Sequence, residues 1–344
     1  MANPTNPAMQ RAASLMQLPA LLSELGVPLD VVLAGTGVLS DELRPDTFIP
    51  YAAYLAILDN AAANTGREDI GLLLGNRQSI AALGPLGRVM CHAATLGEAL
   101  SEFAAFQIGN STGATVYLMQ ADRDVVLGYG IYDPAVHASV HVHDVVVAVG
   151  CKLVKELTLG SVVPEEVWLA RPAPQDLKPY RSLGGMTVRF GQSHSGVVVG
   201  SAGLACRLPQ GNATLHEAAL TELAPDLAKA RKSVAGLVRH ELRHLLLTSR
   251  ARMDDAAAHL GVHPRSLRRR LQEEGVTFEE LKDEVRYAMA RDLLRLGALS
   301  VTDIATTLDY SSASSFVHAF GRWSGISPAK WRKKTNSPAS APSN

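Results

Sequence analysis

Apolar residues in the last third of the chain form two similar blocks with helical spacing. Each block has a cluster of smaller apolar residues, then two large ones four positions apart. The residues are Ala256, Ala257, Leu260, Leu267 and Leu271 in the first block, and Ile304, Ala305, Leu308, Phe316 and Phe320 in the second. Spacings of three and four place side chains on one face of a helix. Residues 253–275 and 301–332 therefore predict two helix-turn-helix units.

Residues with special backbone or capping properties separate the predicted helices. Gly261 stands where the turn of the first unit needs a positive φ angle, and Gly275 stands where its second helix should end. Asp309 holds the turn position of the second unit, where aspartate tolerates a left-handed conformation at modest cost. We expect the carboxylate of Asp254 or Asp255 to cap the first helix.

Between the two units, residues 277–297 have one uninterrupted helical pattern. Its apolar positions are Phe278, Leu281, Val285, Ala288, Met289 and Leu293. About 20 residues at ~1.5 Å each span roughly 30 Å, which is close to the ~34 Å between successive major grooves on one side of B-DNA. The pattern predicts a rigid linker helix of the length that two-site binding to duplex DNA requires.

The chain before these units changes its apolar period several times. Helical spacing predicts helices over residues 18–25, 30–34, 50–64, 83–93, 96–106 and 140–157. Alternating or β-branched runs predict strands over residues 115–120, 125–132, 166–170, 186–190 and 196–200, the first two joined as a hairpin. We therefore expect an α+β N-terminal domain, with helices around a small antiparallel sheet, followed by an all-α C-terminal domain.

The formal net charge of the whole chain is zero, but the charges are distributed unequally along it. Residues 231–344 hold 19 Lys and Arg against 12 Asp and Glu, a net charge of +7, and the preceding residues hold 14 against 21, a net charge of −7. Only the basic C-terminal part is suited to meet phosphates. The acidic front should stay off DNA, as a separate sensing module would.

Three arginines give the first unit its chemistry. Arg265 and Arg269 lie four apart on the exposed face of the second predicted helix, with Arg268 beside them. A guanidinium can form a bidentate contact with guanine in the major groove or bind a phosphate. In the second unit, short hydroxyls replace the arginines and favour backbone contacts over sharp base discrimination. The DNA-binding candidates are Arg265, Ser266, Arg268, Arg269, Ser312, Ser315, His318 and Arg322.

Residues from about 237 to 332 resemble the paired helix-turn-helix domain of the AraC/XylS family of bacterial regulators. The resemblance rests on residues 265–275, on residues 285–290 of the linker and on the aromatic pattern of residues 316–332. It implies that the family's base-reading positions fall on Arg265, Arg268 and Arg269 in the first unit. In the second unit they fall near Ser312, Ser315 and His318.

The front of the chain resembles the α+β sensing and dimerising domain of one AraC subgroup, through residues 84–87, 94–100 and the hairpin after them. This resemblance implies a homodimer and a small-molecule effector, of a class that includes amino acids and fatty acids. Aromatic residues could line its pocket, although most of them are expected to be core. The candidate effector-binding residues are Tyr54, Phe103, Phe106, Tyr117 and Tyr129.

The expected domain limits follow from both patterns. We expect the sensing and dimerisation domain over residues 13–225, a connector over 226–236 and the DNA-binding domain over 237–335, with tails at 1–12 and 336–344 that hold too little apolar surface to order themselves. The start of the chain lacks the features of a signal peptide, and no apolar run is long enough to span a bilayer. We therefore expect a cytoplasmic protein.

Candidate enzymatic and metal chemistry is sparse. His137, His141 and Asp144 have helical spacing compatible with a divalent metal, but ordinary polar positions on a helix are the stronger interpretation. Three scattered cysteines do not predict a disulfide or zinc framework. No catalytic triad or phosphate-binding loop can be assembled from local motifs. We expect no metal, no cofactor and no enzymatic activity.

The sequence thus predicts a ligand-responsive, dimeric transcription regulator that binds double-stranded DNA as an activator, with RNA polymerase as a candidate partner. Two alternatives stay open. One is a constitutive architectural DNA-binding protein with no effector, which a front domain lacking an enclosed pocket would favour. The other is a DNA-binding protein with an enzymatic front domain, which clustered titratable side chains in a pocket would favour.

Overall fold

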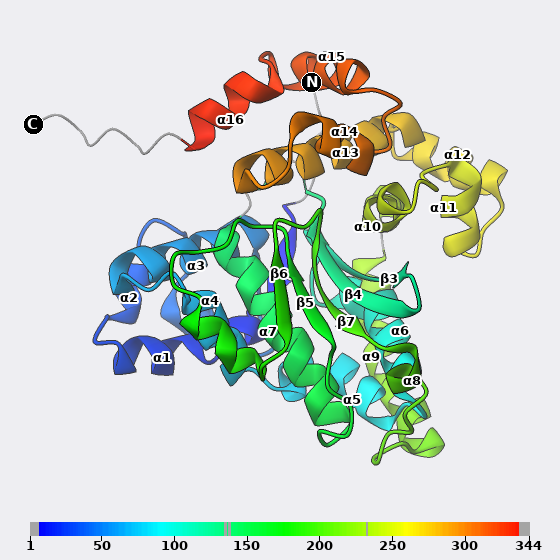
Figure 1. The fold of residues 1–344 in the computed structure, drawn as a ribbon. Helices are drawn as coiled ribbons and strands as arrows, with labels where there is room; N and C mark the ends of the chain where they lie inside the picture. Colours follow the sequence, from blue (N-terminus) through cyan, green and yellow to red (C-terminus); the bar gives the residue numbers. More distant parts are fainter. Residues whose placement is uncertain (1–6, 134–135, 137–138, 232, 337–344) are drawn as a thin grey trace, which may run out of the picture.

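The computed structural model describes residues 7–133, 136, 139–231 and 233–336, which pack as two domains (Figure 1). One buried apolar cluster extends from Ala12 to Leu227, and a second extends from Ala235 to Phe320. Tyr132, which follows the central hairpin, belongs to the second cluster and links the two. None of the described helices is both long and apolar enough to cross a membrane.

The N-terminal domain places helices around a five-stranded sheet, which confirms the predicted α+β class. Its helices are α1 (Leu18–Glu24), α2 (Leu29–Leu33), α3 (Tyr51–Thr65), α4 (Ile70–Arg77), α5 (Pro85–His92), α6 (Leu96–Phe106), α7 (Val140–Leu157), α8 (Ser201–Leu204) and α9 (Ala213–Ala230). Its strands are β1 (Met9–Arg11), β2 (Phe48–Pro50), β3 (Ala114–Ala121), β4 (Asp124–Ile131), β5 (Glu166–Leu169), β6 (Thr187–Phe190) and β7 (Ser195–Val199).

The main sheet has the strand order β3-β4-β7-β5-β6. All its pairs are antiparallel except β5 with β6, which run parallel because the segment between them crosses back through a 3-10 helix over Lys178–Leu183. A separate two-stranded sheet pairs β1 with β2. The prediction of an N-terminal tail over residues 1–12 is wrong for residues 9–12, since β1 adds to the edge of β2 and Ala12 is fully buried.

The two faces of the main sheet pack against different domains. Helix α7 covers one face, where the glycine Gly150 lets it approach Val197 and Leu127. On the other face, Gly128 and Gly130 of β4 and Gly196 of β7 leave a shallow surface, and α10 of the C-terminal domain packs beside β3 there (Figure 1). The C-terminal domain therefore packs against the second face of the sheet.

The C-terminal domain is all helical and contains both predicted helix-turn-helix units. Its helices are α10 (Val234–Leu247), α11 (Met253–His259), α12 (Pro264–Glu273), α13 (Phe278–Leu296), α14 (Val301–Thr307), α15 (Ala313–Ser324) and α16 (Pro328–Asn336). The turns have the predicted left-handed residues, with φ of 65° at Gly261 and 59° at Asp309. The predicted cap of the first helix is wrong: α11 has no side-chain cap, and Asp255 instead lies 2.9 Å from the guanidinium of Arg250.

Two helices occupy most of the expected connector. Helix α9 continues through Ala230 and packs along α5, and α10 begins at Val234. Ser233 caps α10 by accepting a hydrogen bond from the backbone NH of Gly236 at 3.0 Å, and its hydroxyl donates to Glu274 at 2.9 Å. The link between the domains is therefore much shorter than residues 226–236.

Gly130 gives a test of how α10 sits on the sheet. A Cβ at position 130 would overlap the side chain of Arg243 from α10, so Gly130→Ala must displace that buried guanidinium. We expect the free energy of unfolding to fall by about 1–3 kcal/mol, the usual cost of overpacking. Thermal denaturation followed by circular dichroism measures the change.

Gly236→Ala, within α10, is the matched control. A Cβ there meets only Ser233 at ordinary contact distance, and alanine is the better helix former by roughly 0.5–1 kcal/mol. The two substitutions should therefore change stability in opposite directions. An equal, small effect of both would show that α10 does not depend on the space above Gly130.

Candidate nucleic-acid interface

Helix α12 presents the three predicted arginines to solvent. Its start is fixed by Pro264, and the ring of His263 accepts a hydrogen bond from the backbone NH of Arg265 at 3.2 Å. Leu267 and Leu271 are 1% exposed and anchor the helix in the second core. The side chains of Arg265, Arg268 and Arg269 are exposed on the remaining surface, and Ser266 is half-buried.

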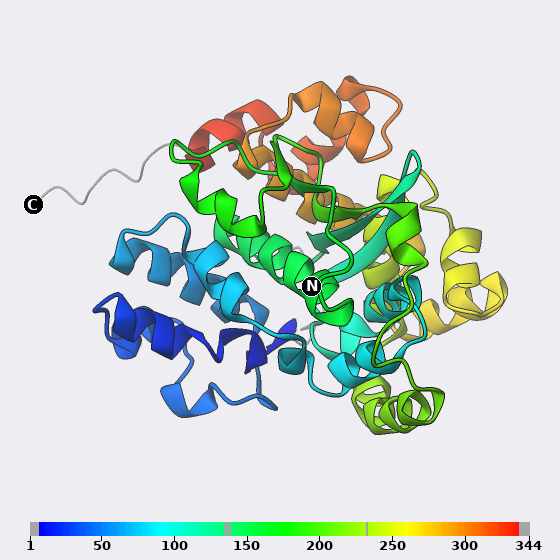
Figure 2. The same cartoon turned by 60° about the horizontal axis from the view of Figure 1, so that its bottom comes forward.

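Most of these cationic side chains remain available to a ligand. Arg269 lies 3.5 Å from Glu273 one turn along the helix, in a pair that is more than half exposed at both ends. Such exposed pairs contribute little stability and exchange readily for a phosphate or a base edge. Helix α12 is therefore a cationic surface at the periphery of the molecule, at the right in Figure 2.

Helix α15 presents a different set of residues. Ser312 is its N-cap and accepts a hydrogen bond from the backbone NH of Ser315 at 3.1 Å, while the two hydroxyl oxygens lie 2.9 Å apart. His318 is exposed. The guanidinium of Arg322, also exposed, lies 3.0 Å from the carboxylate of Asp283 on α13. The serines thus already have a structural role, and the helix offers short polar groups instead of free arginines.

The linker helix α13 holds the second unit in place. Thr277 and Glu280 form a capping box at its start, and Gly297 ends it with a φ of 73°. Arg286 donates to the backbone oxygens of Leu308 at 3.0 Å and Asp309 at 3.1 Å. These bonds fix the left-handed turn of the second unit, a role that the sequence pattern did not reveal because an arginine on a helix usually points to solvent.

The buried contact between α10 and the sheet contains several polar side chains. Arg243 is 2% exposed and donates to the backbone oxygen of Ile131 at 2.6 Å. His240 is 5% exposed, and its Nε2 lies 3.1 Å from the hydroxyl of Thr115. His244 stacks on the ring of Tyr117 with centroids 5.7 Å apart. Sequence reasoning missed all three, because long-range pairing with strands leaves no local motif.

A second polar contact joins α7 to α13 at the end of the sheet. Nε2 of His143 lies 3.7 Å from Oδ1 of Asp292, and both side chains are almost fully buried. Burial acts to raise the pKa of the Asp292 carboxyl, but His143 and then Arg243 hold it below its usual value. The linker between the two DNA-binding units is thus in direct electrostatic contact with the N-terminal domain.

The five candidate effector-binding residues fall into separate groups. Tyr54 and Tyr129 lie on the α7 side of the sheet beside Tyr51, whose hydroxyl pairs with that of Tyr129. Tyr117 lies on the opposite face, against α10. Phe103 and Phe106 lie on α6. These residues are buried or half-buried core, and the structure does not bring all five to one pocket.

One described hollow, at the domain junction, is very small, and another, within the N-terminal domain, is open to solvent. One cavity of about 10 Å³ between the domains is lined by Ile131, Val136, Asp292, Arg295 and others, and has room for about one water. An open groove of about 410 Å³ lies far from these residues, beside Arg67 and Lys178. Neither encloses an organic effector in this conformation.

The histidine and aspartate spacing on α7, weighed above as a metal site and judged to be ordinary polar helix positions, includes a carboxylate that has protein partners. His137 lies outside the described residues. Both carboxylate oxygens of Asp144 are engaged, one by Arg171 at 2.6 Å and the other by Tyr180 at 2.9 Å. Burial raises the pKa of this carboxyl to about 6, although Arg171 opposes the shift. Asp144 therefore ties α7 to the segments that follow β5.

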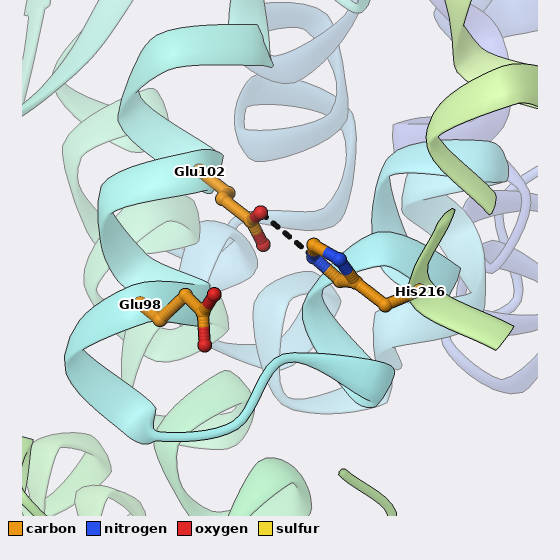
Figure 3. A group of neighbouring side chains, drawn as sticks. All are labelled: Glu98, Glu102 and His216. Atoms are coloured by element: carbon orange, nitrogen blue, oxygen red, sulfur yellow. Dashed lines mark hydrogen bonds and ion pairs between the residues drawn. The ribbon is translucent and has the colours of Figure 1, made fainter. Parts of the chain in front are cut away.

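A different group of potential ligands lies between α6 and α9 (Figure 3). One donor atom from each of Glu98, Glu102 and His216 lies within 4.8 Å of the others. Nε2 of His216 lies 2.7 Å from Glu102, and Glu98 accepts a hydrogen bond from the backbone NH of Ala94 at 2.6 Å. The His216–Glu102 pair joins α9 to α6, and Glu98 lies in the first turn of α6, which Thr95 caps by accepting a hydrogen bond from the backbone NH of Glu98. No sequence motif marks this group, because its helices are far apart in the chain.

Comparisons with protein families agree with this geometry. A family model described as the arabinose-binding domain of AraC transcription regulator, N-terminal, matches residues 26–208. A helix-turn-helix domain model matches residues 256–334.

Individual relatives match along nearly the whole chain. The HTH-type transcriptional regulator VirS of Mycobacterium tuberculosis is 28% identical over 94% of this chain and 96% of its own length. The ornithine utilization regulator of Pseudomonas aeruginosa is 26% identical over 91% of this chain and 93% of its own. The crystal structure of the transcriptional regulator CdpR from Pseudomonas aeruginosa aligns with 89% of this chain and 96% of its own, at 24% identity and a TM-score of 0.44.

The histidines at the junction make its stability depend on pH. Burial lowers the pKa of His194, His240 and His244 from 6.5 to about 4 in each case. Arg243 adds to the effect at His194, and the neighbours His259 and Arg250 add to it at His244. The neutral rings stabilise the fold fully above pH 6.5, and this contribution is lost as pH falls from 6.5 toward 4, because the unfolded chain binds the protons first.

We therefore expect the free energy of unfolding to fall between pH 7 and pH 5, as measured by urea denaturation at several pH values. His240→Gln keeps a hydrogen-bonding group toward Thr115 but does not titrate. The slope of its unfolding free energy against pH should therefore be smaller than the parent's, by the equivalent of about one bound proton. The matched control is His318→Gln on the exposed surface of α15, which should keep the parent slope. Identical slopes for parent and His240→Gln would contradict the assignment.

Proposed function

Because the chain belongs to the AraC family of transcription regulators, we propose that it reads DNA bases chiefly through Arg265, Arg268 and Arg269 of α12. The chain is a helix-turn-helix DNA-binding transcription regulator. The observation that carries the proposal is the exposure of three arginines on the second helix of a well-formed unit. In such units the second helix enters the major groove and presents its N-terminal residues to base edges.

The second unit adds binding at the next groove. Helix α13 has 19 residues and therefore spans about 28 Å, near the ~34 Å between successive major grooves on one side of the duplex. Ser312, Ser315 and His318 offer short donors and acceptors, and Ser266 and Arg322 lie at positions suited to phosphate contacts. The basic net charge of this part of the chain favours binding to the duplex of either unit.

The N-terminal domain is proposed to sense a small molecule and to pair two copies of the chain. The contact between α10 and the sheet supports a mechanism for effector control of DNA binding. Buried polar groups there join the sheet to the first helix of the DNA-binding domain. An effector that prefers one arrangement of the sheet would shift the population of docked and released α10. Tyr54 and Tyr129 lie on one side of that sheet and Tyr117 on the other, and these three remain effector-binding candidates together with Phe103 and Phe106 of α6.

The effect of the bound protein on transcription is the last part of the proposed function. We propose an activator with no enzymatic activity, for which RNA polymerase is a candidate partner. The names of the full-length relatives support regulation as the role of the whole chain. Thermal-shift measurements with amino acids, fatty acids and aromatic acids test the sensing role, because a ligand that binds the native state raises its unfolding temperature.

Arginine substitutions in α12 test base reading directly. We expect Arg268→Ala and Arg269→Ala each to weaken binding to the preferred duplex by about 10- to 100-fold, because a bidentate contact to guanine is worth roughly 1–3 kcal/mol. The duplex is first selected from a random pool by the full chain, and affinity is measured by gel shift at fixed salt.

Arg123→Ala provides the matched loss of one cationic charge. Arg123 is exposed in the turn between β3 and β4, within the N-terminal domain. Removing the Arg123 guanidinium should leave the affinity for the selected duplex unchanged. Full sequence-specific affinity in both α12 variants would overturn the assignment of base reading to that helix.

A further inference from the structure

Val317 is a large apolar side chain exposed on α15. It is 36% exposed, in a helix whose other large apolar residues are buried or half-buried. Phe316 and Phe320, on either side of it, are 0% exposed. Helix α13 separates α15 from the sheet of the N-terminal domain (Figure 1). The chain therefore leaves an apolar group exposed on α15, the helix proposed to meet DNA in the second unit.

The internal symmetry of the domain gives Val317 a counterpart. Leu267 and Leu271 anchor α12 as Phe316 and Phe320 anchor α15, four residues apart and fully buried in both helices. Val317 follows the first anchor by one residue, as Arg268 does in α12. The same position therefore carries a guanidinium in one unit and a branched apolar group in the other.

The surroundings of Val317 allow close approach of a ligand. Ala313 lies one turn before it and Gly321 one turn after it, so small residues flank it along the helix. A Cβ at Gly321 would meet nothing within 4 Å, which shows that this side of α15 is open. Valine cannot pair with a phosphate or donate to a base edge. In the major groove, the apolar group available to it is the 5-methyl of thymine.

We propose that Val317 contacts the 5-methyl group of a thymine and so makes the second half of the binding site specific for that base. The inference rests on the proposed function, since it assumes that α15 enters a major groove. It also sharpens that function: α12 selects guanine by hydrogen bonds, and α15 selects thymine by apolar contact. The second unit then contributes base specificity, not only backbone contacts.

Deoxyuridine substitution tests this contact, because it removes the methyl group and keeps every hydrogen-bonding atom of thymine. The full chain is used to select a duplex from a random pool. Each thymine of the selected site is then replaced singly by deoxyuridine, and the dissociation constant is measured by fluorescence anisotropy. We expect one replacement in the half-site of α15 to weaken binding about fourfold, the effect of one methyl group removed from an apolar contact.

Two variants assign that effect to its residue. Val317→Ala should bind the thymine duplex about as weakly as the parent binds the deoxyuridine duplex, and should no longer distinguish the two. Ser314→Ala, a matched change at an exposed position of the same helix, should keep the full methyl effect. Both changes lie at the surface, and thermal denaturation should show that both variants remain folded.

The outcomes separate this inference from the proposed function. If no thymine in the half-site of α15 responds to deoxyuridine, or if Val317→Ala keeps the same response, the contact is excluded. Loss of binding in Arg268→Ala would still support DNA reading by α12 in that case. If the selection returns no preferred sequence, both the proposed function and this inference fail.

Discussion

Arg243 is the buried cation on which the arrangement of the two domains depends. A guanidinium removed from water is costly unless its donors find acceptors, and the backbone oxygen of Ile131 at the end of β4 provides one. The absence of a side chain at Gly130 provides the room. Both features lie where α10 packs beside β3, so this contact ties the DNA-binding domain to the sheet.

The same contact connects the N-terminal domain with the helix-turn-helix units through packed helices. Helix α10 packs on α11, α12 and α13 as well as on β3, so a shift at the sheet reaches the reading helix of the first unit through a single element. Asp292 of α13 adds a second connection through His143 of α7. Buried polar contacts of this kind suit a switch, because their stability changes sharply when a partner group moves or gains a proton.

The two reading helices share a scaffold but differ in chemistry. Buried anchors four residues apart set the same helix orientation in both units, and left-handed residues at Gly261 and Asp309 make the same turn. The exposed positions then diverge, with arginines on α12 and serine, valine and histidine on α15. The scaffold is therefore the same in both units, while the exposed surfaces proposed to meet DNA differ in chemistry.

The sequence by itself determined the local elements and the class of function. The periods of α6 and α7 predicted their limits, and the repeated anchors predicted both helix-turn-helix units, because these features depend on residues a few positions apart. It could not assign Asp255, which pairs with Arg250, or identify Val317 as exposed. Only the tertiary structure decided that α10 covers the second face of the sheet, because that contact joins residues more than a hundred positions apart and leaves no periodic signal.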